Sequence, residues 1–274
     1  MNRLQSLLRE KRPLVMGILN TTPDSFSDGG LFNNVSSAVA HALQMIEQGA
    51  DIIDVGGEST RPGAAPVALV DELARVIPVI EKIRQQTSVL ISIDTSKVEV
   101  MRQAVAAGAG MINDVLALQM PGAVEICAQL KVPVCLMHMQ GEPRSMQNNP
   151  HYSDVVTEVK TFLEERAAVC LQAGIAGENI VVDPGFGFGK TLQHNLLLLK
   201  HLDQLTAMPY PVLAGVSRKS MIGKILNVES HDRLHGSLAA AVLACSKGAR
   251  ILRVHDVKPT VDALRVCHAV STIH

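Results

Sequence analysis

Short apolar runs alternate along this chain with longer segments whose apolar residues recur at helical spacing. The apolar runs have the length of buried strands and are Leu14–Leu19, Ile52–Val55, Val89–Ile93, Met111–Asn113, Val132–Met137, Ile180–Val182, Val212–Val216 and Ile251–Val254. The helical segments are Val35–Gln48, Val67–Gln86, Lys97–Ala107, Gly122–Leu130, Ser153–Ala173, Leu192–Leu205, His231–Lys247 and Pro259–Val270. Eight strand–helix units in 274 residues predict an α/β fold, a (β/α)8 TIM barrel. A doubly wound open sheet is the alternative, but eight even units fit closure better.

Composition excludes several classes of function. The formal net charge is −1, so we expect neither nucleic acid nor an anionic membrane as a partner. No apolar run reaches the roughly 18 residues of a membrane-spanning helix, and the first residues do not form a secretory signal. The five cysteines are odd in number and widely spaced, which favours reduced thiols in a cytoplasmic protein. No linker divides the chain, so we expect one domain over residues 1–274, with a short N-terminal extension at residues 1–13.

Polar residues stand at or just after the end of nearly every apolar run. They are Asn20, Asp54, Asp94, Asn113, Asp114, His138, Asp183, Lys219, Arg253 and His255. In a (β/α)8 barrel the carboxyl ends of all strands meet at one rim, where active sites lie. Because an unpaired buried polar group costs free energy, a purely structural barrel would not need this set. The sequence therefore predicts a site at this rim, with the loops at residues 20–34 and 56–66 as candidate lids.

The segment Ile180–Thr191, IVVDPGFGFGKT, joins a strand to a glycine-rich turn through one carboxylate, Asp183. The glycines permit positive φ and a close approach of the backbone to a ligand. Two nucleotide motifs are excluded by spacing. A Walker A loop needs glycine where Pro184 stands, and G-F-G-F-G does not fit the dinucleotide pattern G-x-G-x-x-G. The sequence thus predicts that a different ligand docks on Asp183.

The residue types at the rim indicate the chemistry of that ligand. Carboxylates together with Asn113 suit the edge of a heterocycle that presents adjacent N–H donors. A second group suits phosphate oxygens: Thr60, Arg61, Arg253 and His255. The carbonyl of Asn20 could bind Mg²⁺ that bridges a diphosphate. The residues alone therefore indicate a small heterocycle joined to an anionic leaving group, without naming the heterocycle.

Eight motifs, in order, resemble those of the dihydropteroate synthase family. They are GILNTTPDSFSDGG (Gly17–Gly30), DIIDVGGESTRPGA (Asp51–Ala64), ISIDTSK (Ile91–Lys97), INDV (Ile112–Val115), LMHMQGEPRSMQ (Leu136–Gln147), DPGFGFGKT (Asp183–Thr191), GVSRKSMIG (Gly215–Gly223) and LRVHDV (Leu252–Val257). The resemblance runs from about Met16 to Val257 and implies a barrel that binds pterin. It also implies the reaction: (7,8-dihydropterin-6-yl)methyl diphosphate condenses with 4-aminobenzoate to give 7,8-dihydropteroate and diphosphate.

The resemblance also implies a role for each site residue. Pterin is held by Asp94, Asn113, Asp183, Lys219 and Arg253. Diphosphate is held by Thr60, Arg61, Arg253 and His255, with Asn20 on Mg²⁺. The aminobenzoate lies near Phe26, Pro62, Phe188 and Ser217, where Ser217 opens an apparent helix, Arg218–Leu226. A homodimer is expected from the family.

In the implied mechanism the C–O bond to diphosphate ionises first and the aniline amine attacks last. Asp94 stabilises the cation, while Arg61, Arg253, His255 and Lys219 serve the departing diphosphate and the ring. The alternatives are a pterin-binding methyltransferase and a non-catalytic pterin-binding protein.

Several polar or aromatic residues also have simpler interpretations. Asp54 and Asp114 could each brace an arginine or cap a helix. His138 and Phe186 are interpreted as packing residues, and the role of Lys190 is left open.

Overall fold

The strands form one parallel sheet that closes into a barrel. The computed structural model describes residues 1–21, 31–59, 63–142 and 145–273. The strands are β1 (Leu14–Asn20), β2 (Ile52–Gly56), β3 (Leu90–Asp94), β4 (Met111–Asp114), β5 (Val134–Met137), β6 (Ile180–Asp183), β7 (Leu213–Ala214) and β8 (Ile251–Val254). Their order is β6-β5-β4-β3-β2-β1-β8-β7, and a parallel bridge between Val182 and Val212 joins the two edges. All eight predicted runs are strands, which confirms the barrel.

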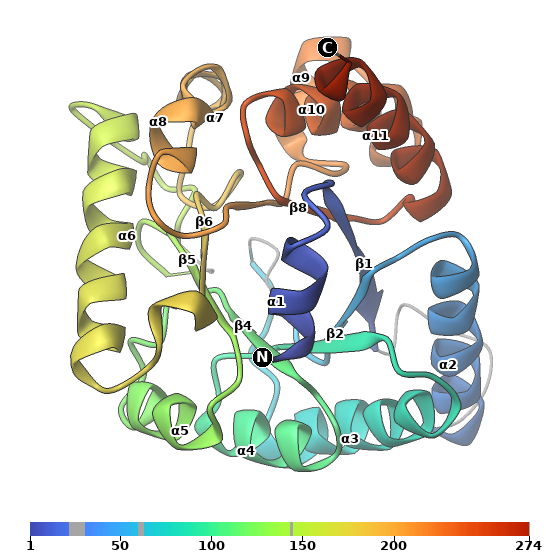
Figure 1. Cartoon of the computed structure of the whole chain (residues 1–274). Helices are drawn as coiled ribbons and strands as arrows, with labels where there is room; N and C mark the ends of the chain where they lie inside the picture. Colours follow the sequence, from blue (N-terminus) through green and yellow to red (C-terminus); the bar gives the residue numbers. More distant parts are fainter. Residues whose placement is uncertain (22–30, 60–62, 143–144, 274) are drawn as a thin grey trace.

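Helices surround the sheet, as the ring of coiled ribbons in Figure 1 shows. They are α1 (Arg3–Leu8), α2 (Leu31–Glu47), α3 (Leu69–Gln86), α4 (Val98–Ala106), α5 (Ala123–Leu130), α6 (Val155–Gln172), α7 (Leu192–Lys200), α8 (Leu202–Thr206), α9 (Ser220–Leu226), α10 (Leu234–Ser246) and α11 (Val257–Thr272), with short 3₁₀ turns at Gly177–Asn179 and Ser230–Asp232. Among the described residues, no helix combines the length and the apolar content needed to cross a membrane.

Alternation along each strand separates two apolar layers. Every second residue of a strand packs against the surrounding helices, and these residues form the larger core, which includes Ile53, Ile91 and Val182. The alternate residues point into the barrel and form the smaller core. Its strand members are Leu14, Met16, Ile52, Leu90, Met111, Cys135, Val181, Leu213 and Ile251. Most of the polar rim residues, namely Asn20, Asp54, Asp94, Asn113, Asp183, Arg253 and His255, therefore continue inward-facing rows that begin with apolar side chains.

The N-terminal segment is a helix that the strand–helix pattern did not predict. Leu4 and Leu7 of α1 belong to the interior core, and α1 lies across the centre of the barrel in Figure 1. Asn2 and Gln5 form a capping box that begins this helix. The predicted extension at residues 1–13 therefore includes a plug at the amino end of the strands, opposite the polar rim.

Candidate active site

The centre of the rim is Arg253, the inward-facing residue near the end of β8. Its Nε donates to Asp54 Oδ2 at 2.6 Å, and a terminal nitrogen donates to Asp94 Oδ2 at 2.7 Å. Asp54 also accepts from Asn113 Nδ2 at 3.0 Å. All three partners are buried. The structure thus joins residues of β2, β3, β4 and β8 into one hydrogen-bonded cluster, and Asp54 braces both Arg253 and Asn113.

The two carboxylates of this cluster share one guanidinium. Burial raises the pKa of Asp94 to about 7, although Arg253 opposes the shift. Asp54 Oδ1 is buried without a hydrogen-bond partner among the described residues, and so is the hydroxyl of Ser92, its register neighbour on β3. An unpaired buried oxygen is costly, so this pocket retains acceptor capacity for a ligand or for water.

Asp183 ends β6 on the same inward row as Val181. Its Oδ1 accepts the backbone N–H of Gly185 at 2.7 Å. Burial raises the pKa of Asp183, and the Gly185 N–H, Lys219 and Arg253 oppose that shift. The turn that follows needs a glycine: Gly185 has φ +67°, and a Cβ built there would lie 1.9 Å from the carbonyl oxygen of His138.

Lys219 and Phe188 meet at the rim from two different loops. The ammonium of Lys219 lies 4.3 Å from the centre of the Phe188 ring, a cation–π contact. Burial lowers the pKa of Lys219 to about 8, with Arg253 acting in the same direction. Phe186, by contrast, is 1% exposed and belongs to the larger core. Phe186 is thus a packing residue of the core, whereas the ring of Phe188 lies beside Lys219 at the rim.

Ser217 and His255 are hydrogen-bonded to each other. The Ser217 hydroxyl accepts the backbone N–H of His255 at 3.2 Å and lies 3.1 Å from its Nδ1. Burial and then Arg253 lower the pKa of His255 to about 4, so the imidazole is neutral near pH 7. The hydroxyl can donate to Nδ1, which leaves the ring proton on Nε2.

The predicted helix start at Ser217 is wrong. Arg218 has φ +54°, Lys219 is the N-cap, and α9 begins at Ser220. Arg218 lies outside the helix, and its side chain forms an ion pair with Asp256 at 2.6 Å. Ser220 is exposed. The hydroxyl available at the start of α9 is therefore that of Ser220.

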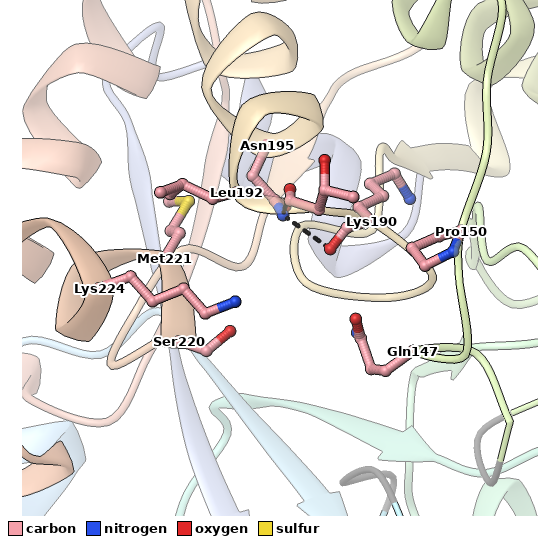
Figure 2. Close-up of a pocket in the computed structure, with 9 residues that line it drawn as sticks. Gln147, Pro150, Lys190, Leu192, Asn195, Ser220, Met221 and Lys224 are labelled. Atoms are coloured by element: carbon pink, nitrogen blue, oxygen red, sulfur yellow. Dashed lines mark hydrogen bonds between the residues drawn. The ribbon is translucent and has the colours of Figure 1, made fainter.

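Beside the glycine turn lies a cavity of about 170 Å³. Figure 2 shows Asn195 and Lys190 on one side of it, and Ser220 and Lys224 of α9 on the other. Asn195 is buried and its amide hydrogen-bonds to the backbone at Gly187, Lys190 and Thr191. The cavity is thus bounded by the same turn that carries Asp183.

Comparison with known proteins gives this site a family. Residues 16–255 match the model of the family described as "Pterin binding enzyme". A dihydropteroate synthase of Escherichia coli (strain K12) is 58% identical over 257 residues, which cover 94% of this chain and 91% of that protein. The chain belongs to the dihydropteroate synthase family. This assignment confirms the resemblance of the eight motifs and disfavours the methyltransferase alternative.

Solved structures of the family agree in fold. The Yersinia pestis dihydropteroate synthase in a sulfonamide drug complex has a TM-score of 0.92 and 52% identity, and the match covers 96% of both chains. The Xanthomonas albilineans enzyme in complex with 7,8-dihydropteroate has a TM-score of 0.88 and 53% identity, covering 96% of this chain and 95% of that one. The family fold thus extends over nearly all of the chain.

The family's motif residues are only partly covered by the structure. Phe26, Thr60, Arg61 and Pro62 lie outside the described residues. Glu58 stands at the start of the loop at residues 56–66 and forms an ion pair with Lys97. Lys97 also pairs, at 2.5 Å, with the fully buried Glu72. The sequence did not predict this network, although Lys97 is the last residue of the motif Ile91–Lys97.

Two polar residues at the strand ends serve the fold. Asp114 has the outward parity and accepts the backbone N–H groups of Leu116 and Leu118, so it shapes a turn. His138 is buried and its ring packs edge-on against Phe162, with centroids 5.0 Å apart. Its interpretation as a packing residue agrees with this position.

The described residues contain no cluster of three or more His, Cys, Asp or Glu side chains arranged to hold a metal ion. Asn20 ends β1 beside Gly56 and is half-buried. Its amide oxygen is a hard donor of the kind that Mg²⁺ accepts when phosphates and waters complete an octahedron. The donor set therefore fits an ion that arrives with a diphosphate better than a resident metal.

Proposed function

We propose that the protein condenses (7,8-dihydropterin-6-yl)methyl diphosphate with 4-aminobenzoate, giving 7,8-dihydropteroate and diphosphate for folate biosynthesis. The observation that carries this proposal is the buried cluster in which Asp54 and Asp94 flank Arg253, with Asn113 on the same carboxylate. Such a cluster matches a flat heterocycle with N–H donors at its edge. In support, Xanthomonas albilineans relatives have been solved with 4-aminobenzoic acid and with 7,8-dihydropteroate.

The pterin would lie across the rim between two carboxylates. The Gly185 amide donates to Oδ1 of Asp183, whereas Oδ2 lies on the side of Gly215. Asp183 would therefore accept hydrogen bonds from the 2-amino and ring N–H groups of the pterin. Asn113 and Asp94 would bind the opposite edge. Lys219 would donate to the ring oxygen and nitrogen, and Arg253 would lie over the ring face. All five side chains are inward-facing or reach the rim from its loops.

The diphosphate would lie on the β1–β2–β8 side of the rim. Arg253 and the Nε2–H of His255 are the described donors on this side. Thr60 and Arg61 would add donors from the second loop, and Asn20 would hold Mg²⁺ with the phosphate oxygens. When bound, the ion would neutralise charge on the leaving diphosphate. A neutral His255 donates a proton in a hydrogen bond without adding a second cation beside Arg253.

The 4-aminobenzoate would enter beside Phe188, with Phe26 and Pro62 closing the pocket from the loops. The resemblance puts the aminobenzoate near Ser217, but the hydroxyl of Ser217 is hydrogen-bonded to His255. We therefore place the carboxylate nearer Ser220, which is exposed at the mouth of the cavity in Figure 2. Lys224, one turn further along α9, contributes positive charge there.

The chemistry would proceed by ionisation of the C–O bond. The dihydropterin ring would delocalise the positive charge, and Asp94, which lies 2.7 Å from Arg253, would stabilise it once the ring lies alongside. The neutral aniline amine then attacks the methylene carbon and loses a proton. Catalytic roles thus fall on Asp94, Lys219, Arg253, His255 and Arg61, and closed loops would keep water from the cation.

We further propose that the protein is a cytoplasmic homodimer. The five cysteines are all free, which suits a reducing compartment. Six of the thirteen large exposed apolar side chains among the described residues lie on three neighbouring helices, α9, α10 and α11, or directly after α11: Ile225, Leu226, Leu243, Val266, Val270 and Ile273. A surface of this kind is typical of a subunit interface. Sedimentation of the purified protein would give twice the mass of the 29.4 kDa chain.

The test of the activity is direct. Purified protein is mixed with pterin diphosphate, Mg²⁺ and 4-aminobenzoate, and dihydropteroate is followed by mass spectrometry. Asp94→Asn is the matched variant, because it keeps the shape of the side chain and removes its charge. We expect product from the wild type and strongly reduced turnover from the variant. Bound pterin without product would favour a non-catalytic pterin-binding protein, and undiminished turnover in Asp94→Asn would contradict the role of that carboxylate.

A further inference from the structure

Lys190 is a buried lysine that the proposed reaction does not use. Its side chain is enclosed at the end of the glycine turn, and the residue is 3% exposed. No carboxylate among the described residues pairs with it within 4.0 Å. Desolvating an ammonium without a paired carboxylate is expensive, and burial lowers the pKa of Lys190 to about 7, although the charge of Asp183 opposes the shift. Hydrogen bonds from its neighbours must therefore stabilise the ammonium.

Neutral acceptors surround the ammonium. Nζ lies 3.0 Å from the carbonyl oxygens of both Gly185 and Phe188, 3.3 Å from that of His138, and 2.9 Å from His138 Nδ1. Burial, and secondly Lys190 itself, lower the pKa of His138 to about 3. The imidazole is therefore neutral and can accept at Nδ1 with its proton on Nε2. One ammonium thus joins the loop after β5 to the turn after β6.

Gly185 and Phe188, whose carbonyl oxygens accept from Lys190 Nζ, also contact side chains of the rim. The N–H of Gly185 holds Asp183 Oδ1 at 2.7 Å. The ring of Phe188 lies 4.3 Å from the Lys219 ammonium. Lys190 is therefore linked through this turn to two side chains of the rim, Asp183 and Lys219, although it contacts neither of them directly.

We propose that Lys190, with His138 as its acceptor, is the positioning residue of the pterin pocket. The ammonium holds the Gly185–Phe188 turn against the β5 loop, and the turn in turn aims Asp183 and places Phe188 against Lys219. This inference rests on the proposed function because it takes the ligand to be a pterin. It does not depend on turnover, because direct binding of the pterin ring tests it.

Lys190→Met keeps the length of the side chain and removes its charge and donors. We expect calorimetry with 6-hydroxymethyl-7,8-dihydropterin to give a Kd at least roughly tenfold above wild type, since small misplacements of binding groups carry losses of this order. The stoichiometry should stay near one per chain. Lys200→Met, on the exposed end of α7, is the matched control and should bind as the wild type does.

A merely structural role gives a different result. It would lower the melting temperature and the binding stoichiometry, while Kd of the folded fraction stays within twofold of wild type. That outcome would overturn the proposal. Wild-type protein that fails to bind the pterin would instead refute the proposed function, so the two failures are distinguishable.

A second pair of variants covers the case in which Lys190→Met does not fold. His138→Asn retains an acceptor near the position of Nδ1, whereas His138→Leu of similar volume does not. We expect His138→Asn to bind pterin within about threefold of wild type and His138→Leu to bind about tenfold more weakly. Equal affinity in the two variants would contradict the role of the Lys190–His138 contact.

Discussion

Gly185→Ala tests the packing that positions Asp183. Two costs can be assigned from the structure. Gly185 has φ +67°, and a non-glycine residue in this left-handed region costs about 1–2 kcal/mol. The new Cβ would also lie 1.9 Å from the carbonyl oxygen of His138. Relieving that overlap moves the turn or the β5 loop by about 1 Å, and forced overpacking costs about 1–3 kcal/mol. We expect the free energy of unfolding to fall by about 2–5 kcal/mol.

The matched control is Gly174→Ala. Gly174 follows α6 with φ +92°, and no atom lies within 4 Å of a Cβ built there. This variant therefore has the backbone cost alone, about 1–2 kcal/mol. Urea unfolding followed by circular dichroism gives both values, and direct pterin binding gives a second readout. We expect weaker pterin binding only in Gly185→Ala, because only that turn carries the N–H that holds Asp183.

Equal losses of stability in the two variants would refute this reasoning. They would mean that the β5 loop yields to the Cβ without cost, so that the 1.9 Å contact does not fix the turn. An unchanged pterin Kd in Gly185→Ala would contradict the second step, the coupling between the turn and the Asp183 carboxylate. The two measurements therefore separate packing from positioning.

Three further predictions use other parts of the molecule. Asp54→Asn removes the charge 2.6 Å from Arg253 and should lower unfolding free energy in urea by about 1–3 kcal/mol, with weaker pterin binding by calorimetry. The pH profile of kcat/KM should rise through about 7 as Asp94 ionises and fall above about 8 as Lys219 loses its proton; a flat profile from 6 to 9 would contradict both assignments. Leu4→Ala should cost about 2–5 kcal/mol in urea unfolding without changing kcat, because its side chain lies at the opposite end of the barrel.

The alternation of apolar runs with helical segments predicts the barrel, and the polar residues at the ends of those runs predict most of the rim. Each strand was bounded by its apolar run, and the rim residues stood where those runs ended. Parity would have sharpened the prediction: Asp183 is two residues beyond the inward-facing Val181, whereas Asp114 has the outward parity of Ile112. The same rule separates Asp183, which faces into the barrel, from Asp114, which shapes a turn.

Other features depend on contacts between distant segments, which no local pattern encodes. Helix α1 has too few residues for a periodic signal, and only the interior apolar row explains where it packs. The start of α9 was placed wrongly because Arg218 pairs with Asp256, a residue 38 positions later. Lys190 was ambiguous for the same reason, since its acceptors include His138, 52 positions earlier.

The shared guanidinium explains why one rim can serve both binding and reaction. Asp54 and Asp94 bind different nitrogens of the Arg253 guanidinium, and burial raises the pKa of Asp94 to about 7. A ring that becomes cationic beside Asp94 gives this carboxylate a second positive partner, so the pKa of Asp94 must fall as the cation forms. By linkage, the same interaction stabilises the cation more than the neutral ground state. In the proposed mechanism, Asp94 would therefore bind the reacting ring most strongly once the C–O bond has broken, which is the condition for lowering the barrier.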